Sequence, residues 1–385
     1  MFTEVVFVIL LSIFWYYIHI VETIRIPLQI NPLDGTVTTQ VEMGDVDAST
    51  TLNIGIDTGV AYSWFLHSSC TIDTSILNTE LRQKLLVRSV SITRQTTVSA
   101  PMPPQPSTSP APTPPLHIKY ADGGTTKGFF VPNTTWRFKP NVPSQQHRLQ
   151  QLTWGAATTI SETVQQDQDV SHFERGNVDG WLGLGRLHTT STSDNTTTKN
   201  VLTSTNLFSS VSPMWSITFQ LRRTPYSMVF QNLHRQYQLQ WGGPGHPQGI
   251  KVHKEVQHWA TVVRNVTVNG CRAINDEYNV LIDLGAGSIF TTTDMISSQC
   301  WKQKQWQKTT LFSMEFVMGN GKKITVPHLS NNVSYHSTLR PQKKSRRQTI
   351  VLGLPFFMRQ DVTLVVAKKR EKKDDIDSWE YFIDI

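Results

Sequence analysis

The stretch Asn53-Ile-Gly-Ile-Asp-Thr-Gly-Val-Ala-Tyr-Ser-Trp-Phe65 decides how this chain is organised. A short apolar run leads to Asp57, and Gly59 follows two residues later. The apolar run predicts a buried strand, and the glycine supplies backbone angles that a side chain would forbid, so the carboxylate is presented at a tight loop. One such Asp-x-Gly motif is a weak signal, because aspartate and glycine are also the commonest turn residues.

A second copy of the pattern comes much later, in Val280-Leu-Ile-Asp-Leu-Gly-Ala-Gly-Ser-Ile-Phe290, where Asp283 stands 226 residues after Asp57. Each copy is followed by an apolar run that contains Leu-Gly. These runs are Asp179-Gly-Trp-Leu-Gly-Leu-Gly185 and Ile350-Val-Leu-Gly-Leu-Pro-Phe-Phe357. The same order given twice indicates the internal duplication of a whole lobe.

With this duplication the chain resembles the pepsin-like aspartic peptidases, over roughly residues 36 to 385. The resemblance implies an all-β, bilobal acid protease fold, in which two pseudo-symmetric β lobes each contribute one catalytic aspartate to a central cleft. It assigns Asp57 and Asp283 as the catalytic residues. The residues that it places in support of the pair are Thr58, Gly59 and Gly285.

A β-hairpin is predicted just before the middle of the first lobe, at residues 118–131, with a Gly-Gly turn that includes Gly123. In the resembled family the matching hairpin is the flap over the substrate cleft, and Tyr120 falls on its tyrosine. Trp64, seven residues after Asp57, matches the tryptophan beneath that flap. The alternative is an edge hairpin with a surface tyrosine.

The chemistry expected of two adjacent carboxylates is general acid–base hydrolysis. Two carboxylates held close together share one proton, because both cannot ionise cheaply. The ionised member takes a proton from water while the protonated member donates to the scissile carbonyl, with no metal and no cofactor. The sequence offers no HExxH or Cys-x-x-Cys metal motif. The expected function is therefore an aspartic endopeptidase with a polypeptide substrate.

Three residues depart from the resembled family. The residue after each aspartate is normally Thr or Ser, whose hydroxyl ties the two loops together; Thr58 keeps that hydroxyl and Leu284 lacks it. Val60 and Ala286 also lack a hydroxyl that could bond a catalytic carboxylate. The loss of these hydroxyls is expected to raise the pKa values of the two aspartates. The usual prosegment is also expected to be missing. These departures favour the alternative function, a weak or inactive relative that binds a protein or glycan in the cleft.

The chain is expected to divide into four parts. Residues 22–35 are expected to be a connector, 36–245 the N-terminal lobe and 246–385 the C-terminal lobe. A Pro/Ser/Thr-rich insert at 96–115 interrupts the first lobe as an extended loop. The best helix candidate is 291–301, and residues 362–366 and 379–385 are expected to pair as antiparallel strands.

Residues 1–21 form the fourth part, a signal peptide or a signal anchor, because 5–21 is strongly apolar. Either reading sends the chain into the secretory pathway, to be secreted or, if the segment is retained, anchored in a membrane. Four Asn-x-Ser/Thr tripeptides agree with this route, at Asn133, Asn195, Asn265 and Asn332.

Cysteine content and charge add less. Cys271 and Cys300 flank Asp283 and can bridge within the second lobe, which leaves Cys70 unpaired. The net charge of +7 comes largely from two runs, at 343–347 and 368–373. No nucleic-acid-binding motif accompanies them, so no nucleic-acid partner is expected. A monomer is expected.

Overall fold

The computed structural model describes the parts of the chain that carry the strands, and all structural statements below refer to them. The described residues are 23–31, 35–43, 50–73, 115–119, 124–138, 148–161, 178–186, 214–232, 249–252, 258–287, 289–292, 295, 313–326, 339–342, 349–367 and 379–385.

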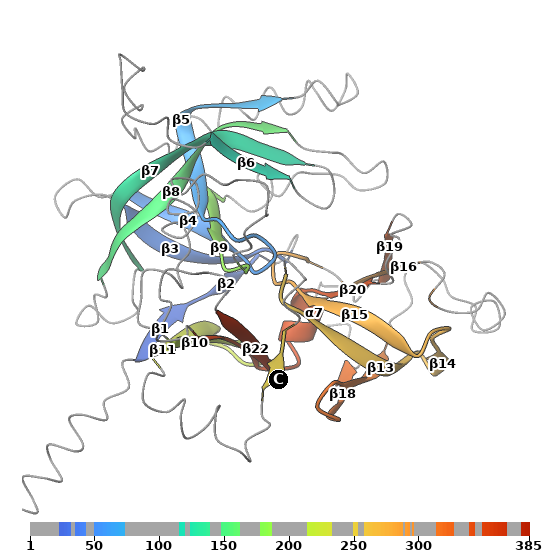
Figure 1. Ribbon diagram of the computed structural model, residues 1–385. Helices are drawn as coiled ribbons and strands as arrows, with labels where there is room; N and C mark the ends of the chain where they lie inside the picture. Colours follow the sequence, from blue (N-terminus) through green and yellow to red (C-terminus); the bar gives the residue numbers. More distant parts are fainter. Residues whose placement is uncertain are drawn as a thin grey trace, which may run out of the picture.

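The first of three described sheets belongs to the N-terminal half of the chain and has eight strands (Figure 1). Most neighbours are antiparallel, but β4 pairs with β9, and β5 with β8, in parallel. In spatial order the strands are β2 (Gln29–Ile30), β3 (Val37–Met43), β4 (Thr50–Asp57), β9 (Gly180–Gly183), β5 (Trp64–Asp73), β8 (Arg148–Ser161), β7 (Thr125–Phe138) and β6 (Pro115–Lys119).

The second sheet belongs to the C-terminal half and repeats this design. Here β15 pairs in parallel with β20, as β4 does with β9. The strand order is β18 (Lys323–Val326), β17 (Met314–Met318), β13 (Ala260–Val268), β15 (Glu277–Ile282), β20 (Thr349–Leu352), β16 (Ile289–Thr292) and β19 (Leu339–Gln342), with β14 (Cys271–Arg272) paired to β13.

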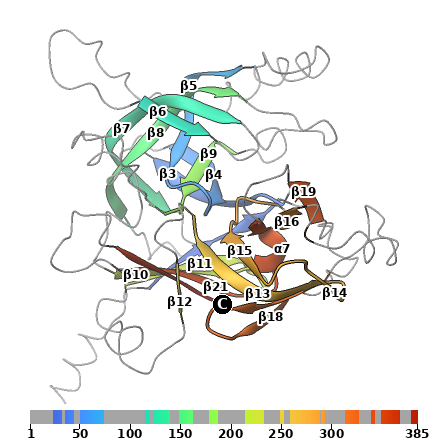
Figure 2. The ribbon, with the colours of Figure 1, turned by 45° about the vertical axis from the view of Figure 1, so that its right-hand side comes forward.

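A third sheet of six strands joins the two halves and lies below the first sheet in both ribbon views (Figure 2). Its order is β1 (Thr23–Pro27), β11 (Ser227–Asn232), β10 (Met214–Gln220), β21 (Val362–Ala367), β22 (Glu380–Asp384) and β12 (Ile250–Lys251). The predicted antiparallel pair at the end of the chain is confirmed as β21 and β22. The fold is therefore all-β and bilobal, of the pepsin-like kind, as predicted.

The connector expected at 22–35 contains strands instead. β1 pairs along its whole length with β11, and β2 pairs with β3. The reason is a short alternation that the sequence analysis overlooked: Ile24, Ile26 and Leu28 are buried, whereas Arg25 is exposed. Pro27 is tolerated because β1 is the edge strand of its sheet.

The helix expected at 291–301 is wrong at its start, because Thr291 and Thr292 end strand β16. Phe290 pairs with Val351 of β20, so sheet pairing overrides the local helical preference. The one helix among the described residues is α7 (Leu354–Phe357), a single turn with Pro355 near its start and all four side chains buried.

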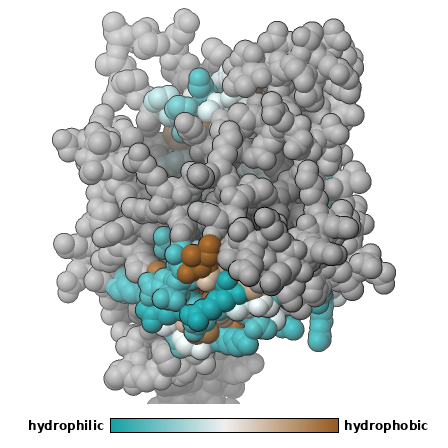
Figure 3. All heavy atoms as spheres, turned by 90° about the vertical axis from the view of Figure 1, so that its right-hand side faces the viewer, coloured by the Kyte–Doolittle hydropathy of each residue, from teal (hydrophilic) through white to brown (hydrophobic). Residues whose placement is uncertain are grey.

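The core is built from the facing apolar sides of these sheets. One large cluster of buried side chains runs through both lobes and the six-stranded sheet. On the face shown in Figure 3 the described surface is mostly hydrophilic, and Ile274, 59% exposed, is the one exposed large hydrophobic side chain among the described residues. No helix within the described ranges is long and apolar enough to span a membrane; the apolar segment 5–21 lies outside them.

Candidate active site

The first aspartate lies at the end of strand β4. Asp57 pairs in register with Gly183 of β9, and the Leu184 N–H donates to the Asp57 carbonyl oxygen at 2.7 Å. Beyond the strand, the Gly185 N–H donates to the Val60 carbonyl oxygen at 2.7 Å. The Leu-Gly run therefore holds both sides of the loop that carries Asp57.

The second aspartate is also held by its Leu-Gly run, although its own hydrogen bond to that run has the opposite direction. Asp283 follows strand β15, and its N–H donates to the Leu352 carbonyl oxygen of β20 at 3.1 Å. The Leu354 N–H donates to the carbonyl oxygen of Ala286 at 2.8 Å. Val60 and Ala286 each stand three residues after their aspartate, so the duplication seen in the sequence is also present in the backbone hydrogen bonds.

Two glycines bring the loops face to face. A Cβ atom built on Gly59 would lie 2.8 Å from Oδ2 of Asp283, and one built on Gly285 would lie 2.8 Å from Oδ1 of Asp57. Real Cβ atoms do not approach other atoms so closely, so any side chain at either position would push the opposite carboxylate away. Each glycine therefore packs on the other lobe's aspartate, which places the two carboxyl groups in one site.

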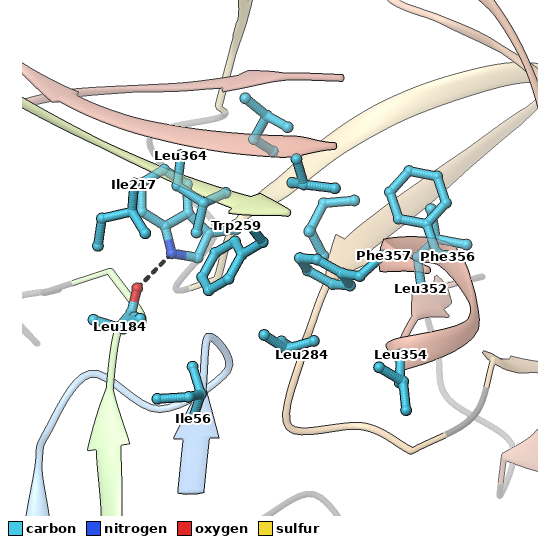
Figure 4. Close-up of a cluster of buried hydrophobic side chains, with 14 of the residues drawn as sticks. Ile56, Leu184, Ile217, Trp259, Leu284, Leu352, Leu354, Phe356, Phe357 and Leu364 are labelled. Atoms are coloured by element: carbon cyan, nitrogen blue, oxygen red, sulfur yellow. Dashed lines mark hydrogen bonds between the residues drawn. The ribbon is translucent and has the colours of Figure 1, made fainter. Parts of the chain in front are cut away.

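Thr58 joins the loops by hydrogen bonds. Its hydroxyl donates to the Ile282 carbonyl oxygen at 3.1 Å and accepts from the Leu284 N–H at 2.8 Å. Leu284 has no hydroxyl to offer in return. Its side chain is 2% exposed and lies between Ile56 of the first lobe and Leu354 of the second (Figure 4). One loop is thus anchored by hydrogen bonds and the other by apolar packing.

The pKa values of both carboxyl groups are raised. Burial, followed by the negative charge of Asp283, raises the pKa of Asp57 to about 8, although the Gly59 and Val60 N–H groups, at 2.7 and 3.1 Å from Oδ1, oppose the shift. Burial also raises the pKa of Asp283, against the N–H groups of Gly285, Ala286 and Gly59 and the nearby His258. Raised pKa values were expected from the missing hydroxyls of Val60 and Ala286; the first cause in the structure is burial.

His258 is a member of the site that the sequence analysis missed. Its Nδ1 lies 3.1 Å from the carbonyl oxygen of Gly59, across the lobe boundary, and its charge lowers the pKa of Asp283. The missed signal is strand register. Ala260 pairs with Leu281 in the antiparallel β13–β15 ladder, so two residues further along His258 stands opposite Asp283.

The remaining predicted site residues lie differently. Trp64 has no exposed surface and packs among Leu116, Ile118 and Phe130 of the β6–β7 hairpin. Tyr120 and Gly123 lie outside the described residues. Within the described ranges no cluster of His, Cys, Asp or Glu fits a metal ion.

Cys70 and Cys271 lie among the described residues, and Cys300 lies outside them. Cys271 is disulfide-bonded and Cys70 is free. Burial raises the pKa of the Cys70 thiol to about 12, so this thiol stays protonated and unreactive at ordinary pH.

Comparison with known proteins agrees with this geometry. A search among curated proteins returned no match. The family model described as eukaryotic aspartyl protease matches residues 38–338, a span that contains both aspartate loops and the Leu-Gly run of the first lobe. The chain therefore belongs to the eukaryotic aspartyl protease family.

Proposed function

We propose that the chain is an active aspartic endopeptidase in which Asp57 and Asp283 are the catalytic residues. The observation that carries the proposal is the mutual packing of Gly59 on Asp283 and of Gly285 on Asp57. It puts two carboxyl groups of unequal environment in one site, as general acid–base hydrolysis of a peptide bond requires.

The environments favour different roles for the two carboxyl groups. The two carboxylates repel each other mutually, so the pair holds one proton. Because His258 favours the ionised form of Asp283, Asp57 retains that proton and donates it to the scissile carbonyl oxygen. Asp283 has His258 beside it, so it is the ionised member that takes a proton from the attacking water. Because the pKa of Asp57 is about 8, activity is expected to extend to neutral pH.

We further propose that the lobes comprise residues 36–245 and 246–385 and that a polypeptide binds between them, beneath the hairpin that carries Tyr120 and Gly123. Thr58, Gly59 and Gly285 keep the pair in position. The apolar segment 5–21 directs the chain into the secretory pathway.

The test is cleavage of an unfolded protein by the purified chain from pH 3 to 9, with and without pepstatin. Inhibitable cleavage that is lost in Asp57→Asn and Asp283→Asn is expected. A folded wild-type chain that cleaves nothing at any pH contradicts the proposal.

A second candidate, a binding protein without turnover, is favoured by Leu284, because the resembled enzymes carry a hydroxyl at that position. Titration calorimetry separates the two candidates. Pepstatin bound by a wild-type chain that shows no cleavage would support the binding protein.

A further inference from the structure

We propose that His258 is a positioning residue of this site, which joins the two aspartate loops through Gly59 and places a protonatable ring beside Asp283. The inference rests on the proposed function for its kinetic consequences, but its geometry stands on its own. His258 precedes strand β13 of the second lobe, and its contact lies in the loop after β4 of the first lobe.

The hydrogen bond defines the protonation of the ring. A carbonyl oxygen accepts hydrogen bonds and cannot donate one, so the contact of 3.1 Å between Nδ1 and the Gly59 oxygen requires a proton on Nδ1. Histidine is the side chain that commonly changes charge between about pH 5 and 8.

Gly59 is the residue through which His258 acts. Its N–H donates to Oδ1 of Asp57 at 2.7 Å, its Cα faces the carboxyl group of Asp283, and its carbonyl oxygen accepts from His258. A shift of the Gly59 backbone would therefore disturb both carboxyl groups at once. Holding that backbone is a positioning role, because His258 needs no contact with a substrate.

The charged surroundings of His258 favour an effect on Asp283. Asp283 stands opposite it in the continued β13–β15 register, and Asp57 is the partner of Asp283 in the pair. The next residue, Trp259, donates to the Leu184 carbonyl oxygen at 2.7 Å and packs on Tyr381. The ring of Tyr381 in turn lies 4.3 Å from the guanidinium carbon of Arg186. A positive charge on His258 therefore stabilises the ionised form of Asp283 and leaves the proton on Asp57.

Two variants separate the hydrogen bond from the charge. In His258→Asn the side-chain amide places a neutral donor near the position of Nδ1, whereas His258→Phe keeps a ring and loses both donor and charge. The pH profiles of kcat and KM from pH 3 to 9 are compared with those of wild type. The control His117→Asn changes an exposed histidine on β6 and is expected to leave both limbs of the profile in place.

In His258→Asn the acid limb of kcat/KM is expected to move to higher pH, because Asp283 loses a nearby positive charge. His258→Phe is expected to show the same movement and a further five- to tenfold loss of kcat/KM, since the Gly59 hydrogen bond is also gone. An acid limb unchanged in both variants overturns the role of the charge. Equal kcat/KM in the two variants overturns the positioning role.

A measurement without turnover keeps this inference separate from the proposed function. The protein is labelled with ¹³C at aspartate Cγ, and the signal of Asp283 is identified by its absence in Asp283→Asn. Its chemical shift is then followed by NMR as a function of pH in wild type and in His258→Asn. A higher midpoint in the variant supports the inference even if the wild type cleaves nothing. If the midpoint is the same in His258→Asn as in wild type, the inference is overturned. Cleavage by the wild type would then still support the proposed function.

Discussion

The two aspartate loops share one backbone plan but are held by different forces. In the first, Thr58 makes two hydrogen bonds to the opposite loop, of 3.1 and 2.8 Å. In the second, Leu284 occupies the equivalent position, and its side chain is buried among apolar groups of both lobes (Figure 4). A hydroxyl that satisfies two backbone groups has been retained on one side only.

The difference teaches that the pair does not need symmetric support. The parallel strand pairs β4–β9 and β15–β20 place the carboxylates, and the glycines set how closely they approach. We propose that the support then decides which carboxyl group holds the proton. A symmetric site would have to distinguish its two carboxyl groups by the substrate alone, whereas here His258 stands beside one of them.

Replacement of either aspartate by asparagine is expected to cause the largest loss of activity, and it tests whether both loops take part in the chemistry. Each variant loses one half of the acid–base pair, so kcat is expected to fall by about a thousandfold in both. Initial rates on an unfolded protein measure the loss. If Asp283→Asn kept more than about a tenth of wild-type activity, the second loop would not be part of the chemistry.

Adding a methyl group to either loop glycine is expected to have the next largest effect. Gly59→Ala and Gly285→Ala each put a carbon about 2.8 Å from the opposite carboxyl group, so the loops must separate. A misplacement of this size is expected to lower kcat by about 100-fold. Gly319→Ala is the control, because the nearest atom to its new carbon lies 3.8 Å away. A variant of Gly59 or Gly285 with full activity would show that these glycines do not pack closely on the opposite carboxyl groups.

Exchanging the supports addresses the two anchors directly. Thr58→Val is isosteric and removes both hydrogen bonds, so the free energy of unfolding is expected to fall by about 1–3 kcal/mol. Leu284→Thr is also expected to be destabilising, because it removes buried apolar contacts. Chemical denaturation measures both values. If Leu284→Thr were more stable than wild type, the apolar packing of the leucine would not compensate for the hydroxyl that the family carries at this position.

A matched control exists in the six-stranded sheet. The hydroxyls of Thr218 and Thr363 form a hydrogen bond of 2.9 Å between β10 and β21. Thr218→Val is expected to lower the free energy of unfolding by about 0.5–1.5 kcal/mol and to leave activity unchanged. Loss of activity in this control would mean that activity falls with any destabilisation of the sheets, and the loss in Thr58→Val could not then be assigned to the aspartate loops.

The pH dependence of stability tests the burial of the first aspartate by itself. Asp57 has a folded pKa of about 8, above its ordinary value of 3.8, so the folded state holds a proton that the unfolded state has released. Stability is therefore expected to fall as pH rises from about 4 to 8, by at most about 1.4 kcal/mol per pH unit for this group. Thermal melts should show a shallower fall in Asp57→Asn. Identical slopes would mean that Asp57 ionises normally in the folded chain.

Much of this architecture was predictable because it depends on local patterns that occur twice. The two Asp-x-Gly loops and their Leu-Gly runs predicted both the lobes and the residues that meet. Strand β1 was missed because its alternation is short, with only Ile24 and Ile26 buried, and because Pro27 ends it. The segment at 291–292 was misjudged because pairing of β16 with β20 decided it, and such pairing is not visible locally.

His258 shows the same limit at the site. A histidine 25 residues before Asp283 has no meaningful spacing along the chain. Its place follows only once β13 and β15 are paired in the register that sets Ala260 against Leu281. The sequence shows that Leu284 lacks the hydroxyl that Thr58 keeps. It does not show the packing that replaces this hydroxyl, because that packing comes from α7 and the other lobe.

The edge strand β1 has a consequence for where the enzyme can work. Only Glu22 separates Val21, the end of the apolar segment, from Thr23, where β1 joins the sheet shared by both lobes. At about 3.5 Å of reach per residue, an anchor retained in a bilayer would hold that sheet less than about 10 Å from the end of the anchor. Such a tether has no stalk, so the enzyme would meet only polypeptides close to the membrane. Cleavage of the segment would exchange that restricted range for free diffusion.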